Sequence, residues 1–272
     1  MIRNSVVAGQ FYEDSPRKLA EELASAMQEA APRTRVFGAV CPHAGYIYSG
    51  KVAGAVYSRI EPADTYVILG PDHYGIGSPF SIMTEGVWRT PLGETRIDSA
   101  LAKEIFKRSR NLEDDPLAQS REHSIEVQLP FIQYASPRSE IVPISLRHYA
   151  ADEAFLAICV EIGSAIGAAA STMKHKVTVI ASSDFTHYQP RAQAKSNDTA
   201  ALAAILSLDA KGLFSKVREL DISMCGYAPV AAAITASKML GAKKAELVMY
   251  ADSGDVTLDP SSVVGYAGVT FT

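Results

Sequence analysis

The chain has little cysteine and no long apolar run. Its 272 residues include three cysteines, Cys41, Cys159 and Cys225, which are widely spaced. This small, odd number argues against a disulfide framework and favours a reducing compartment. No stretch approaches the roughly eighteen uninterrupted apolar residues of a membrane helix, and the first residues lack the apolar core of a signal peptide. We therefore expect a cytoplasmic protein without a membrane partner.

The chain also lacks a large excess of positive or negative charge. Lysine and arginine total 26 and aspartate and glutamate 30, so the formal net charge is −4, and no basic block interrupts the chain. Proteins that bind nucleic acid or lipid through charge carry basic clusters. The composition therefore excludes a nucleic-acid partner and leaves a small-molecule or peptide ligand. It leaves the oligomeric state open.

Three short apolar runs are each followed closely by a histidine. The runs are residues 36–41, 66–69 and 177–181, and the histidines are His43, His73 and His187. Continuous apolar runs of this length are typical of strands buried on both faces, as in parallel sheets covered by helices. Ligands of such sheets bind beyond the carboxyl ends of the strands, so the three imidazoles are expected to converge. Convergent imidazoles indicate a metal or proton-transfer site.

Strand and helix patterns alternate along most of the chain. This predicts an α/β fold with a central, mainly parallel or mixed sheet and helices on both faces. Since no repeat, low-complexity segment or linker is visible, we interpret residues 1–272 as one domain. Further strands are expected at residues 141–146, 246–251 and 263–270. Helices are expected at about residues 15–30, 49–60, 98–109, 120–134 with a break at Pro130, 151–170, 190–206, 210–220 and 228–240.

The first two histidines lie in loops with distinct neighbours. A lone loop histidine is most often solvated, but His43 is followed by Gly45, which permits close ligand approach. Cys41 lies two residues before His43 and would share its face in an extended chain; such a cysteine is more often a small buried side chain than a ligand. His73 follows an expected turn at residues 70–72. There Asp72 either stabilises the turn through its polar side chain or accepts a hydrogen bond that orients an imidazole.

The third histidine, His187, lies within a segment rich in polar side chains, residues 182–188. A serine, an aspartate and a histidine suggest a hydrolase triad, but sequence adjacency does not supply triad geometry. The Gly-x-Ser-x-Gly nucleophile motif is also missing there. General base or metal ligand is the better assignment for His187, with Asp184 near it.

Two further residues are candidates on spacing alone. His123 and Glu126 are three residues apart, a spacing that suits metal ligation but is also an ordinary surface pair. Cys225 lies just before an expected helix, where backbone dipoles would lower the pKa of its thiol. A thiolate is a good ligand for iron, copper or zinc, whereas an inert, partly buried thiol is the plainer interpretation.

Taken together, several segments resemble the Memo family. They occur in the expected order over nearly the whole chain: residues 7–12 (VAGQFY), 42–50 (PHAGYIYSG), 69–73 (LGPDH), 122–131 (EHSIEVQLPF), 182–188 (SSDFTHY) and 225–226 (CG). The resemblance implies a fold similar to that of the class III extradiol dioxygenases.

The resemblance also implies the roles of the site residues. The metal ligands would be His43, His73 and Cys225, and His187 would take the place of the acid/base histidine. Asp184 and His123 would line the same pocket as further catalytic residues. The implied metal is non-haem iron(II), with copper or zinc as alternatives. Because a cysteine replaces the carboxylate of the dioxygenase metal site, catechol cleavage is not carried over.

Three functions follow from this site. The leading one is a redox oxidoreductase using iron or copper. The second is a binding module, without turnover, for a small ligand or, as the resemblance implies, for phosphotyrosine-type peptides; the motifs contain no arginine, the usual phosphate reader. The third is a zinc hydrolase. The sequence leaves open whether the protein is an enzyme.

Overall fold

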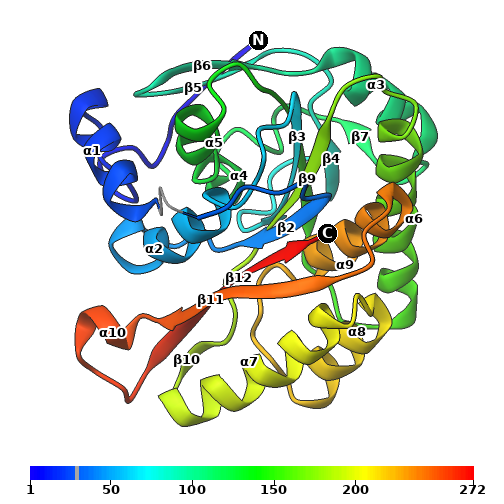
Figure 1. Ribbon diagram of the computed structural model, residues 1–272. Helices are drawn as coiled ribbons and strands as arrows, with labels where there is room; N and C mark the ends of the chain where they lie inside the picture. The colour runs from blue at the N-terminus through cyan, green and yellow to red at the C-terminus, as the bar shows by residue number, and fades with distance from the viewer. Residues whose placement is uncertain (28–30) are drawn as a thin grey trace.

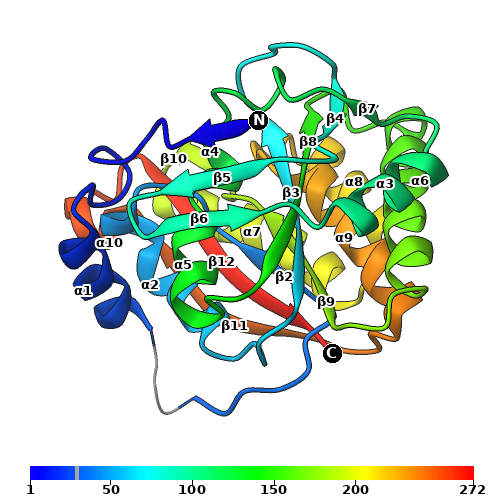
Figure 2. The same ribbon diagram turned by 90° about the horizontal axis from the view of Figure 1, so that it is seen from above.

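A mixed β-sheet forms the centre of the fold and has helices on both faces (Figures 1 and 2). The computed structural model describes residues 1–27 and 31–272. In the described part of the chain this sheet has nine strands, in the order β10-β12-β2-β9-β3-β8-β4-β7 with β11 paired to β12. The strands are β2 (Gly38–Cys41), β3 (Thr65–Asp72), β4 (Phe80–Ile82), β7 (Glu113–Asp114), β8 (Glu140–Arg147), β9 (Val177–Ser182), β10 (His187–Gln189), β11 (Ala245–Asp252) and β12 (Val263–Phe271).

The three strands that precede the histidines are neighbours at the middle of this sheet. β9 lies between β2 and β3 and is parallel to both, with Cys41 opposite Ser182 and Leu69 opposite Ala181. Every residue of the three strands is buried, as the continuous apolar runs predict. Their carboxyl ends therefore reach one edge of the sheet together, which confirms the expected convergence.

The helices form one group on each face (Figure 2). On one face α2 packs against β2, β11 and β12, with α1 and α5 beside it, and on the other α9 packs against β2, β3 and β9, with α6 and α8 beyond it. The predicted fold class is confirmed. The helices are α1 (Pro16–Ala26), α2 (Tyr46–Tyr57), α3 (Ser99–Arg108), α4 (His123–Glu126), α5 (Leu129–Ala135), α6 (Glu153–Ala170), α7 (Arg191–Leu206), α8 (Ala210–Glu219), α9 (Tyr227–Leu240) and α10 (Gly254–Thr257).

The boundaries of the first two helices differ from the expected ones. The first helix begins at Pro16 as predicted but ends at Ala26, earlier than predicted, because Met27 takes an extended backbone; the predicted end near residue 30 itself lies outside the described residues. The second helix begins at Tyr46, three residues earlier than predicted, because Gly45 takes the N-cap position. The Ser49 hydroxyl donates to the carbonyl of Ala44 rather than capping the helix.

The segments around His73 and His123 also depart from expectation. Residues 70–72 are not a turn but the end of β3, because each of them pairs with β8. The predicted helix over residues 120–134 is divided into α4 and α5, and Pro130 lies in the first turn of α5, where its missing N–H is tolerated.

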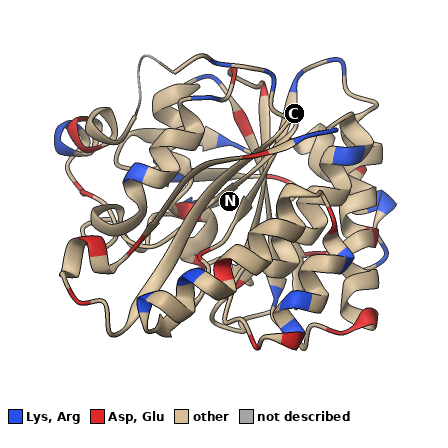
Figure 3. Ribbon diagram, turned by 60° about the horizontal axis from the view of Figure 1, so that its bottom comes forward, with Lys and Arg blue, Asp and Glu red and all other residues tan. Residues whose placement is uncertain are grey.

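One helix, α6, is long and apolar enough to span a membrane by length and composition alone. Half of it is buried inside the protein, and it packs closely against α9. A core helix passes the same test, so the packing explains its apolar sequence. Figure 3 shows acidic and basic residues interspersed over the helices rather than gathered by sign.

A second, small sheet was not anticipated. It joins β1 (Ile2–Asn4), β5 (Val87–Thr90) and β6 (Gly93–Arg96), with β1 parallel and β6 antiparallel to β5. Trp88 is fully buried in it beneath the guanidinium of Arg3, 4.3 Å from the ring centroid. Strands this short carry too few residues for a periodic pattern to emerge.

Candidate metal centre

Two glycines allow the elements around the site to approach one another. A side chain on Gly70 of β3 would begin 2.3 Å from the hydroxyl of Ser124, so only glycine lets α4 press against this strand. A side chain on Gly226 would begin 2.5 Å from the carbonyl of Ser182. These contacts bring His123 beside His73, and Cys225 beside the end of β9.

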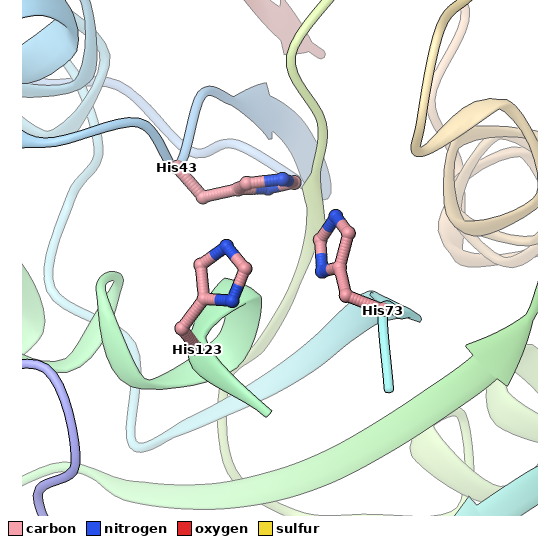
Figure 4. A group of neighbouring side chains, drawn as sticks. All are labelled: His43, His73 and His123. Carbon is pink, nitrogen blue, oxygen red and sulfur yellow. The ribbon is translucent and has the colours of Figure 1, made fainter. Parts of the chain in front are cut away.

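His43, His73 and His123 form the centre of the site (Figure 4). One ring nitrogen of each lies within 4.8 Å of the others, a spacing that fits a shared metal ion. The ring centroids are 5.2 Å apart for His43 and His73, and 4.5 Å apart for His73 and His123. The group comes from the loop after β2, the end of β3 and the first residue of α4. It is compatible with metal binding.

His43 is fully enclosed. Its backbone N–H donates to the carboxylate of Asp184 at 2.8 Å, and its Nδ1 lies 2.9 Å from the hydroxyl of Ser182. Burial, reinforced by the neighbouring histidines, holds the pKa of His43 well below its ordinary value. His43 is therefore neutral at physiological pH, as a metal ligand must be.

His73 is held by Glu122, a residue that sequence reasoning did not single out. The carboxylate accepts from the His73 backbone N–H at 2.7 Å and lies 2.9 Å from Nδ1. Burial alone would lower the pKa of His73, but the hydrogen bond and charge of Glu122 outweigh it and raise that pKa. The same contacts lower the pKa of Glu122 to about 2 despite its burial. Asp72, for which turn chemistry and an orienting role were both open, accepts the backbone N–H groups of Tyr74 and Gly75 and pairs with Arg147 at 2.8 Å.

His123 is held less firmly. Its Nδ1 is 3.5 Å from the hydroxyl of Tyr74 and 3.6 Å from Glu122, and its ring lies against Phe11. Burial lowers the pKa of His123 to about 4. Glu126, its candidate partner three residues on, points elsewhere and pairs with Arg3.

Cys225 lies against His43 rather than within the histidine group. Its Sγ is 3.3 Å from Nε2 of His43, but it is not a member of the mutually close set of donor atoms. Burial, followed by the charge of Asp184, raises the pKa of the thiol. The expected lowering by the helix N-terminus is therefore wrong for the metal-free protein, because desolvation outweighs the dipole. Cys41 is fully buried in the core.

Asp184 and His187 are the remaining predicted site residues, and Asp184 contacts both His43 and Cys225. Asp184 is buried, and burial raises its pKa. The carboxylate accepts the backbone N–H of His43, so it fixes the loop after β2. His187 lies at the start of β10, where Nδ1 is 2.7 Å from the carbonyl of Ser223. A carbonyl only accepts, so Nδ1 carries a hydrogen, and in the neutral form of the ring Nε2 is the acceptor.

These residues share one cavity of about 560 Å³. His43, His73, His123, Asp184 and His187 all line it; Cys225 is not a lining residue but contacts Nε2 of His43. The cavity therefore gathers five of the six predicted site residues. The remaining walls are mainly aromatic and hydroxyl side chains, with no lysine or arginine among the described lining residues: Gln10, Phe11, Ala44, Gly45, Tyr48, Tyr188, Ser253, Thr257, Ser262, Val264 and Tyr266.

Comparison with known proteins identifies the family of this fold and site. A family model described as Memo-like protein matches residues 3–270, so the chain belongs to the Memo-like family. It is 45% identical over 270 residues to a MEMO1 family protein of Methanosarcina barkeri, covering 98% of this chain and 99% of that protein. A MEMO1 family protein of Methanothermobacter thermautotrophicus is 42% identical over 279 residues, with 98% and 99% covered. The resemblance in the sequence motifs is confirmed.

Proposed function

We propose that this protein binds iron(II) or copper at His43 and His73 and acts as a cytoplasmic redox oxidoreductase. The observation that carries the proposal is the group of three imidazole nitrogens within 4.8 Å of one another. In two of the three, Nδ1 is occupied by a protein partner, Ser182 for His43 and Glu122 for His73. Nε2 of each remains for a metal, which is how protein metal sites fix ligating histidines.

Cys225 is the third ligand in this proposal, and His123 a further donor. Imidazole suits iron, copper and zinc, while a thiolate selects against magnesium and calcium. Metal binding would deprotonate the Cys225 thiol, whose Sγ is already 3.3 Å from Nε2 of His43. Bound iron or copper would supply one-electron and oxygen chemistry.

His187 is the proposed proton carrier. Its Nδ1–H is held by the Ser223 carbonyl, so the lone pair of Nε2 is free for a ligand proton in the cavity. Asp184 supports this chemistry by fixing the loop that carries His43, since its carboxylate accepts from that backbone.

The cavity favours an uncharged small molecule or plain peptide segment. Phe11, Tyr48 and Tyr266 offer aromatic surface, and Ser253 and Ser262 offer hydroxyls. Phosphate groups are usually read by arginine, and the described lining contains none. The same cavity would serve a binding function without turnover, but its lining argues against phosphotyrosine as the ligand.

Calorimetry of binding under anaerobic conditions tests the metal assignment. We expect wild-type protein to bind iron(II) with one metal per chain, and binding to be lost in the double variant His43→Ala/His73→Ala. A Cys225→Ser variant should bind more weakly than His123→Ala. His175→Ala, an exposed histidine outside the cavity, is the matched control. Unchanged stoichiometry in the double variant would contradict the site.

A zinc hydrolase is the second candidate, favoured by the three-histidine group, which is a known donor set of catalytic zinc. Metal analysis of protein purified without added metal separates the two. Zinc at full occupancy together with redox inactivity would support the hydrolase and contradict the oxidoreductase.

A further inference from the structure

A buried hydrogen-bond chain lies beneath His43. Ser182 and Gln128 are both fully buried. The Ser182 hydroxyl is 2.7 Å from the carbonyl of Ser124, 2.8 Å from Nε2 of Gln128 and 2.9 Å from Nδ1 of His43. Gln128 is itself fixed, because its Nε2 also donates to the carbonyl of Pro42 at 2.9 Å.

The partners and their distances together assign a direction to each bond in this chain. A hydroxyl has one hydrogen, and the Ser124 carbonyl can only accept it. The Gln128 amide nitrogen only donates, so the Ser182 oxygen accepts from it. The Ser124 carbonyl is the nearer acceptor, at 2.7 Å against 2.9 Å for Nδ1 of His43, so the Ser182 hydrogen is assigned to Ser124 and the Ser182 oxygen accepts from His43. The proton of neutral His43 is therefore on Nδ1.

We propose that Ser182 is a positioning residue that fixes the Nδ1–H tautomer of His43 and so leaves Nε2, which faces the Cys225 thiol at 3.3 Å beside the histidine group, as the unprotonated ring nitrogen. Gln128 holds Ser182 in the required orientation. This inference deepens the proposed function, on which its metal-binding consequence rests. It assigns a role to two residues that touch neither the cavity nor a metal.

The same logic separates the three histidines. The Glu122 carboxylate, which only accepts, fixes Nδ1–H on His73 in the same way. His123 has only distant partners at Nδ1, at 3.5 and 3.6 Å. His43 and His73 are thus prepared as Nε2 ligands in the metal-free protein, whereas His123 is not.

Nitrogen-15 NMR of metal-free wild-type protein tests the tautomer without any substitution. Protonated and unprotonated ring nitrogens differ strongly in chemical shift, and His43→Asn provides the assignment. We expect His43 to be protonated at Nδ1 only. Protonation at Nε2, or an even mixture of tautomers, would overturn the proposal.

A variant pair then tests the consequence for the metal. Ser182→Ala removes the acceptor, and we expect His43 to populate the Nε2–H tautomer and iron(II) affinity to fall about 10- to 100-fold. Ser145→Ala is the matched control, since Ser145 is buried on β8 and its hydroxyl has no partner among the described residues. Equal affinities in both variants would contradict the proposal. If Ser182→Ala does not fold, the NMR measurement of the His43 tautomer in the wild-type protein tests the proposal.

The two proposals fail in different ways. A wild-type protein with the Nδ1–H tautomer that binds no metal would contradict the proposed function and support the tautomer assignment. A protein in which metal-free His43 is protonated at Nε2, but which still binds iron(II) through His43, would support the proposed function and contradict the tautomer assignment.

Discussion

His43 and His73 differ in what occupies their Nδ1 atoms. A neutral hydroxyl serves His43, and the carboxylate of Glu122 serves His73. The carboxylate raises the pKa of His73, whereas burial lowers that of His43. A metal therefore competes with a proton at His73 and at the Cys225 thiol, so we expect affinity to increase with pH as these protons are lost.

The Glu122→Gln substitution tests the carboxylate. We expect metal affinity to fall about 10- to 100-fold, because the amide supplies no charge to orient and strengthen His73. Glu161→Gln is a matched control, since that carboxylate also accepts several bonds, from Ser109, Arg110 and Asn111. Calorimetric titration measures both, and equal loss in the two variants would contradict the role of Glu122.

His123 gives the metal-free protein a pH-dependent stability. Its pKa is lowered from 6.5 to about 4, so the unfolded chain takes up a proton that the native site resists. This stability is fully present above pH 6.5 and is lost as the pH falls toward about 4. Between about pH 7 and about pH 5 the loss amounts to about 2 kcal/mol. We expect the free energy of urea unfolding to fall less over this pH interval in His123→Gln than in the wild-type protein, the difference being about this amount. An identical pH dependence in the two proteins would contradict the burial argument.

At this scale the sequence predicted the histidines that line the cavity better than the residues that hold them. His43, His73 and His187 were found because each follows an apolar run, a local signal. Glu122, Ser182 and Gln128 act across contacts that join α4 and its neighbours to the central strands. No sequence periodicity marks such contacts, and the local candidate, Asp72, pairs with Arg147 instead.

At the scale of elements, the contact between α4 and β3 sets the spacing of His123 and His73. A methyl group on Gly70 would begin 2.3 Å from Ser124 and 2.8 Å from Ile125. We expect Gly70→Ala to lower the free energy of unfolding by roughly 1–3 kcal/mol, as overpacking does, and to weaken metal binding. Gly50→Ala is the control, because its nearest neighbour is 3.2 Å away. Urea unfolding and calorimetry measure both effects; unchanged binding in Gly70→Ala would contradict this role of the contact.

The central elements were predictable and the peripheral ones were not. β2, β3 and β9 are buried on both faces, so their sequences are continuously apolar. β1 and β4 have three residues each and β7 has two, lengths at which tertiary pairing rather than sequence pattern decides the structure.

At the scale of the whole molecule, a buried ion pair ties the N-terminal strand to the site. Arg3 pairs with Glu126 and donates to the backbone carbonyl of Glu122 at 2.6 Å, so β1 is joined to the helix that carries His123. Glu126 also accepts from the hydroxyl of Tyr12 at 2.7 Å. The small sheet therefore supports the histidine group from outside the main sheet.

We expect Arg3→Met to lower the free energy of unfolding by roughly 3–5 kcal/mol, because it leaves the Glu126 carboxylate buried without its cation. Arg17→Met, which breaks an exposed pair with Glu21, should change it by less than about 1 kcal/mol. Chemical denaturation of both variants measures the difference. Equal changes in the free energy of unfolding would show that the buried pair stabilises the protein no more than the exposed one.

The overall architecture and family followed from the sequence, since the motifs span the chain and the family model covers residues 3–270. That the chain forms one domain in the cytoplasm stays a prediction. The central claim is the location of the metal, and anomalous X-ray diffraction at the iron edge from iron(II)-loaded crystals tests it most directly. We predict one peak about 2.0–2.3 Å from Nε2 of both His43 and His73. A peak bound by other residues, or no peak at this cavity, would contradict the account.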